Sequence, residues 1–73
     1  MKVFEFLYNG CIHESAAATH SIHKTRKGAE MALEFNKQRA IKEWEEMYEP
    51  EEREQYPFGQ HQYWGIRETE ILS

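Results

Sequence analysis

The chain has 73 residues, a formal net charge of −4 and a single cysteine, Cys11. This length predicts one domain spanning residues 1–73, and one cysteine excludes a disulfide within it. No apolar run approaches the roughly 18 residues of a membrane span, and Glu5 interrupts the run that a signal peptide would need. We therefore expect a cytoplasmic protein that does not enter a membrane.

The first 24 residues predict two strands joined by a long or bulged connection. Val3–Tyr8 alternates aromatic side chains on one side with Val, Glu and Leu on the other. Asn9 and Gly10 follow as a turn signal, because both residue types tolerate positive φ. Cys11–Ala18 is the connection, and Thr19–Lys24 carries the β-formers of the second strand.

A long amphipathic helix is predicted over Thr25–Glu49. Thr25 is a good N-cap, and Pro50 ends the helix because the residue before a proline avoids helical angles. At about 100° per residue, six side chains fall on one side and predict the buried stripe: Ala29, Leu33, Asn36, Ala40, Trp44 and Met47. A short second helix is expected from Pro50 to about residue 55, because proline is favoured at the first helical position.

The last predicted strand is Tyr63–Leu72, which gives the element order ββαβ. Three strands need a covering layer, and one long helix across one face supplies it. We expect an α+β domain with a three-stranded antiparallel sheet in the order 2-1-3. Trp44 and Trp64 are interpreted as core residues, one from the helix and one from the last strand.

Two segments carry a resemblance to a known group of proteins. They are Thr25–Glu30 at the helix start and Tyr63–Glu68 in the last strand. The chain resembles the short ββαβ accessory proteins of tailed bacteriophages and mobile elements. The resemblance implies a protein that binds and inhibits or redirects a host protein, in host takeover or anti-defence, and it implies no site residues.

The charge layout of the long helix opposes its macrodipole. Acids stabilise a helix start and bases its end, yet Arg26 and Lys27 open this helix and glutamates close it. Where a sequence departs from such a preference with no evident gain in stability, the departure points to a candidate functional site. The alternative is a solvated helix end stabilised by packing. On the functional interpretation, the partner-binding acids are Glu43, Glu45, Glu46, Glu49, Glu51 and Glu52.

Met31 and Phe35 lie one helical turn apart on the side opposite the buried stripe. Exposed aromatic and Met side chains are typical interface anchors. They predict contact with a partner protein or with a second copy of the chain. The alternative is that a loop or the second helix covers them.

Other kinds of site find less support. Cys11, His13, His20 and His23 lack the spacing of a closed zinc site, so we expect no metal. Cys11 as a nucleophile with His13 as its base would need an orienting third group and an oxyanion site, and nothing marks either, so we expect no enzymatic activity. We also expect no cofactor. The aromatic residues around Phe58 could stack on nucleic-acid bases, but no basic residue interleaves with them. An acidic chain is also a poor non-specific nucleic-acid binder.

The sequence thus favours a non-enzymatic protein that binds a host protein, with the acidic helix end occupying a basic site. The alternatives are a small nucleic-acid- or metal-binding module, or a structural homodimer. This expectation combines the charge layout with a family-level analogy.

Overall fold

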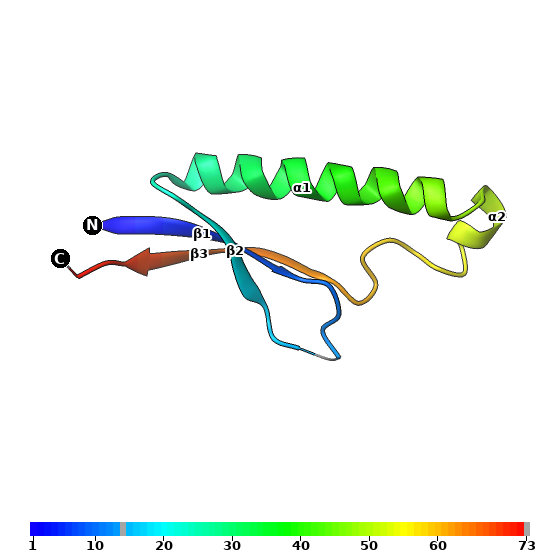
Figure 1. Cartoon of the computed structure of the whole chain (residues 1–73), viewed down its shortest axis with the longest axis horizontal. Helices are drawn as coiled ribbons and strands as arrows, with labels where there is room; N and C mark the ends of the chain where they lie inside the picture. Colours follow the sequence, from blue (N-terminus) through cyan, green and yellow to red (C-terminus); the bar gives the residue numbers. More distant parts are fainter. Residues whose placement is uncertain (14, 73) are drawn as a thin grey trace.

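The computed structural model describes residues 1–13 and 15–72 and confirms the predicted α+β architecture. The elements follow in the order β1, β2, α1, α2 and β3 (Figure 1), with the bounds Lys2–Asn9, Ala18–His23, Arg26–Met47, Pro50–Arg53 and Tyr63–Glu70. The sheet order is β2-β1-β3, and both strand pairs are antiparallel. Within the described residues, no helix combines the length and apolar character needed to cross a membrane.

The central strand β1 presents its aromatic side chains to α1. Phe6 pairs with Ile66 and Tyr8 pairs with Trp64, so these four side chains share one face of the sheet. Figure 1 shows α1 running along the sheet on one side and no helix on the other side. Phe6 is fully buried between the two layers, at 0% exposure.

A β-bulge in β2 changes the direction of one side chain. Phe6 pairs with Ser21 but Leu7 pairs with Thr19, which leaves His20 as the extra residue. A bulge breaks the strict alternation of a strand. The His20 ring consequently lies 5.1 Å from the Phe6 ring centroid, on the helix side of the sheet.

The predicted helix cap is confirmed. The Thr25 hydroxyl accepts a hydrogen bond from the Gly28 backbone N–H at 3.0 Å. The long helix ends at Met47, two residues earlier than predicted, and Tyr48 is its C-cap. Proline opens α2 as expected, and that helix ends at Arg53 rather than near residue 55. Strand β3 likewise ends at Glu70, and Leu72 is 92% exposed.

The prediction that Met47 belongs to the buried stripe is wrong. Its side chain is 72% exposed. The physical reason is that α1 continues past the end of the strands, so that no sheet lies beneath its last turn (Figure 1). Trp44 and Trp64 pack between the layers but are only half-buried. The buried apolar residues among those described are Val3, Phe6, Leu7 and Ala29, of which Phe6 and Ala29 are fully buried.

The chain turns after β1 as predicted, but without a positive φ at Asn9 or Gly10. Among the described residues only Gly59 has a positive φ, of 76°. The chain leaves β1 instead through the buried Asn9 side chain, whose Oδ1 accepts from the Cys11 backbone N–H at 2.9 Å and from Ser15 Oγ at 3.0 Å. Asn side chains commonly replace a backbone turn in this way.

Candidate partner-binding surface

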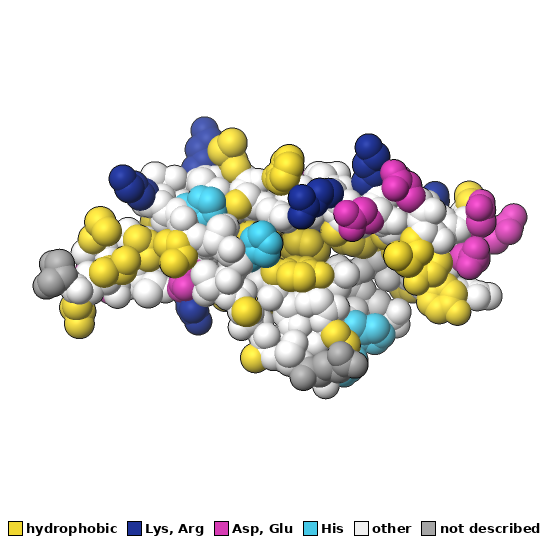
Figure 2. All heavy atoms as spheres, in the orientation of Figure 1, with side chains coloured by type: hydrophobic (Ala, Val, Ile, Leu, Met, Phe, Trp, Pro, Cys, Tyr) yellow, Lys and Arg dark blue, Asp and Glu magenta, His cyan; other side chains and the backbone are white. Residues whose placement is uncertain are grey.

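Seven glutamates gather where α1 meets α2, and we call the segment Glu43–Glu54 the acidic end. All seven are exposed, and Figure 2 shows acidic side chains concentrated at this tip of the molecule. The ion pairs among the described residues join Lys2 to Glu68, Arg67 to Glu5 and the N-terminus to Glu70. None of these pairs involves the acidic end, so its charge is directed to solvent.

The last turn of α1 contains no basic residue, and Arg53 supplies a cation there from outside the helix. Its Nε donates to the Tyr48 carbonyl at 3.1 Å, and its Nη2 donates to the Glu45 carbonyl at 2.8 Å. Its guanidinium carbon also lies 5.7 Å from the Trp44 ring centroid. A cation at the last carbonyls of a helix is favourable. The unfavourable charge layout is therefore partly offset by a residue that lies beyond the helix.

Three of the predicted partner-binding acids also stabilise the start of α2. Glu49 and Glu52 form a capping box, in which the Glu52 carboxylate accepts from the Glu49 backbone N–H at 3.4 Å. Glu51 and Glu52 occupy the first turn, where negative charge is favoured. Glu43, Glu45 and Glu46 make no side-chain hydrogen bond within the described residues. These three carboxylates are thus available to a partner.

Met31 and Phe35 are exposed, at 63% and 67%. Neither a loop nor α2 covers them, because α2 lies beyond the far end of α1 (Figure 1). Phe35 and Glu46 are eleven positions apart, about 16 Å along the helix axis. Figure 2 shows basic side chains between the two groups. The predicted anchor residues and the acidic end therefore share the outer side of α1 without forming one compact patch.

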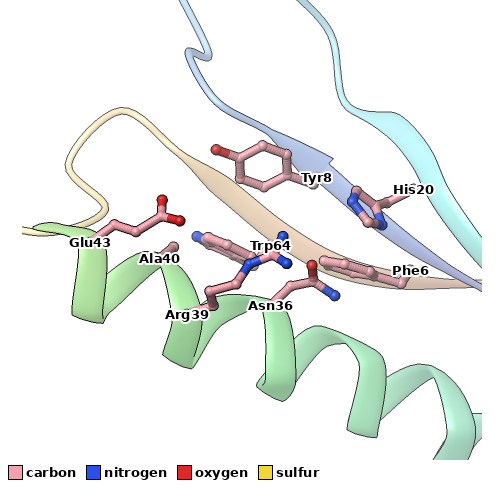
Figure 3. Close-up of a pocket in the computed structure, with 8 residues that line it drawn as sticks. All are labelled: Phe6, Tyr8, His20, Asn36, Arg39, Ala40, Glu43 and Trp64. Atoms are coloured by element: carbon pink, nitrogen blue, oxygen red, sulfur yellow. The ribbon is translucent and has the colours of Figure 1, made fainter.

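A recess opens between α1 and the sheet, with a volume of about 170 Å³. Figure 3 shows Phe6, Tyr8 and Trp64 along its sheet side, and Arg39 and Glu43 projecting from the helix. Trp64 lies 4.6 Å from the Tyr8 ring centroid and 6.1 Å from that of Phe6. This recess was not predicted from the sequence. The sequence does contain one signal for it: the stripe residues Asn36 and Ala40 are polar and small. Their side chains do not fill the space above these rings.

A larger hollow of about 440 Å³ adjoins this recess, and we call it the aromatic groove. It lies between the second half of α1 and residues 56–62. Its lining includes Tyr8, Glu43, Trp44, Tyr48, Tyr56, Phe58 and Gln62.

Contacts among the aromatic rings shape the groove. The Tyr48 and Tyr56 rings stack with centroids 5.2 Å apart, and Phe58 lies 6.0 Å from Trp44. Trp44 Nε1 donates to the Tyr56 carbonyl at 2.7 Å and ties the loop to the helix. The positive φ of Gly59 lets the loop turn back, so the aromatic side chains converge on one side.

Two polar atoms beside these hollows are buried without a hydrogen-bond partner in the described part of the chain. They are Oε1 of Gln62, which lines the groove, and Nε1 of Trp64, which lines the recess. Buried polar groups usually have partners, so each such atom needs an explanation.

The histidines do not gather into a metal site. Nε2 of His13 and Nδ1 of His61 lie 3.1 Å apart, and the His61 carbonyl accepts from the Ile12 backbone N–H at 2.8 Å. This pair joins the two long loops, a contact that sequence spacing did not indicate. His20 and His23 lie elsewhere on β2. No group of three or more His, Cys, Asp or Glu residues among residues 1–13 and 15–72 could hold a metal ion.

A buried carboxylate lies on the side of the sheet that faces away from α1. Glu5 is 8% exposed and accepts hydrogen bonds from Thr19 Oγ1 at 2.7 Å, Arg67 Nε at 2.8 Å and Thr69 Oγ1. These donors, led by Arg67, lower the pKa of Glu5 from 4.5 to about 2. Sequence reasoning missed this network because its members are far apart in the chain.

In comparisons with known proteins, no protein-family model, curated protein or solved structure matches this chain. The basis for a functional interpretation is therefore the geometry of the exposed surfaces.

Proposed function

We propose that this chain is a non-enzymatic binding protein, of the phage accessory type, that binds a host protein and inhibits or redirects it. The acidic end occupies a basic site on that partner. The observation that carries the proposal is the set of seven exposed glutamates at the ends of two adjoining helices and beside them, none of them in an ion pair within the described residues.

Fixed like charges repel one another, so this arrangement has an electrostatic cost that a basic partner would relieve. The acidic end is also held in place before binding, by the contacts of Arg53 with the end of α1 and of Trp44 with the Tyr56 carbonyl. Preorganisation lowers the entropy lost on association. A site that normally holds nucleic acid would suit, with the carboxylates in the place of phosphates.

Met31 and Phe35 extend the proposed surface along the outer side of α1. Both are largely exposed, and large apolar side chains of this kind contribute much of the binding energy at protein interfaces. In this proposal the acidic end guides the encounter, and Met31 and Phe35 slow the dissociation of the complex.

The test is an affinity capture from host-type bacterial lysate with three proteins, of which the two variants are matched in charge. One is the wild type, one carries Glu45→Gln with Glu46→Gln, and the control carries Glu30→Gln with Glu34→Gln on the same helix. We expect the wild type and the control to retain one stoichiometric protein that the polyanion heparin releases. The Glu45/Glu46 variant should lose it. Equal capture by all three, or no capture at all, would contradict the proposal.

The apolar part of the surface needs its own variant. Phe35→Ala should weaken capture of the same protein by roughly ten-fold or more, as expected for an interface anchor. Leu72→Ala is the matched control, because Leu72 is also exposed but lies outside the proposed surface. If both substitutions have the same effect, Phe35 is not an anchor.

A further inference from the structure

We propose that the aromatic groove binds an arginine side chain presented by the partner protein. This inference rests on the proposed function, since it names the group by which a basic partner is recognised. It concerns a different surface from Met31 and Phe35, because the groove lies under the second half of α1 rather than on its outer side.

The lining of the groove is rich in aromatic side chains. Trp44, Tyr48, Tyr56 and Phe58 all contribute to it. A guanidinium group is attracted to the face of an aromatic ring and stacks on it as a plane. The same chain already makes this contact twice, with Arg53 at 5.7 Å from the Trp44 ring centroid and Arg26 at 5.2 Å from that of Phe4.

The charged side chains around the groove favour a cation. Among the described lining residues, Glu43 is the one acidic side chain, and no Lys or Arg lines the groove. Arg39 lines the neighbouring recess instead. The Glu43 carboxylate has no ion-pair partner within the described residues. A cation in the groove would be placed next to this carboxylate and near the other glutamates of the acidic end.

The groove also holds an acceptor without a donor: the buried Oε1 of Gln62 has no hydrogen-bond donor within the described part of the chain. Arginine carries five N–H donors in a rigid plane, enough for Glu43 and Gln62 together. A nucleic-acid base could stack on the same rings. Its phosphates would then meet the glutamates of the acidic end, so the charge selects against it.

The test is a titration followed by NMR of the ¹⁵N-labelled full chain. The probes are three blocked Gly/Ser peptides that differ at one central position: arginine, lysine, or citrulline, the neutral isostere of arginine. We expect the arginine peptide to shift the Trp44 indole N–H and the amides of residues 56–62 saturably. The citrulline and lysine peptides should bind at least roughly ten-fold more weakly, the citrulline peptide because it lacks the charge.

Two variants locate the binding. Glu43→Gln should weaken the arginine peptide several-fold, whereas Glu46→Gln, with the same charge change outside the groove lining, should have little effect. Three outcomes would overturn the inference: binding of the citrulline or the lysine peptide as tight as that of the arginine peptide, equal losses in the two variants, or no shift at millimolar peptide. The titration needs no host partner, so its failure and the failure of lysate capture are separate results.

Discussion

The Glu5 carboxylate lies among three donors on strands β2 and β3, and it connects both outer strands to the centre of the sheet. In the sequence this residue interrupts an apolar run and gives no sign of a partner. The Arg67 guanidinium and the Thr69 hydroxyl come from positions more than 60 residues away. Only the strand register, which pairs Glu5 with Arg67, brings them together.

The lowered pKa of Glu5 predicts acid sensitivity. Because the folded-state pKa of about 2 lies below the ordinary value of 4.5, the stabilisation is fully present above about pH 4.5. This stabilisation is lost as the pH falls from about 4.5 to about 2. Glu5→Gln should therefore lower the urea midpoint clearly at neutral pH and much less near pH 2, measured by circular dichroism. Glu34→Gln is the control. A pH-independent difference between Glu5→Gln and wild type would contradict this assignment.

Arg53 is the second residue whose role depends on the fold. Arg53→Gln should destabilise the protein by about 1 kcal/mol, because it removes charge-assisted hydrogen bonds to two carbonyls at the end of α1. Chemical denaturation followed by Trp fluorescence measures the change. Lys42→Gln, which removes a charge from the exposed face of the same helix, should change the stability by less than half of this amount. Equal effects would show that only net charge matters.

At the scale of elements, local sequence signals predicted the secondary structure well. Thr25 and Pro50 mark helix boundaries through their own backbone chemistry, and the alternation in β1 fixes which residues face the helix. The errors fall where tertiary context decides. Met47 fits the buried stripe by periodicity but lies past the sheet. The predicted turn after β1 is present, but it is built with the Asn9 side chain and not with positive φ.

The cap of α1 gives a direct test at this scale. Thr25→Ala should reduce stability by about 1 kcal/mol, because the Gly28 N–H loses its acceptor. Thr25→Ser keeps a hydroxyl and should retain most of the stability. Thermal unfolding followed by far-UV circular dichroism compares the two. If the Ser variant is as unstable as the Ala variant, the hydroxyl is not the source of the stabilisation.

At the scale of the molecule, the chain is elongated, with extents of 52 × 24 × 12 Å. Both termini lie at one end and the acidic end lies at the other (Figure 1). The sequence located the glutamates and the exposed pair Met31 and Phe35. It could not locate the aromatic groove, because Tyr8, Trp44 and Phe58 come from three separate segments that meet only in the fold.

Site-specific photo-crosslinking in host-type lysate tests directly whether the acidic end contacts a host protein. Met47 and Ile22 are both exposed apolar residues, at 72% and 61%, but only Met47 lies in the acidic end. Replacing either with a photoreactive phenylalanine derivative removes no charge. The account predicts one covalent adduct with a host protein from position 47 and none from position 22. Identical adducts from both positions, or none from position 47, would contradict it.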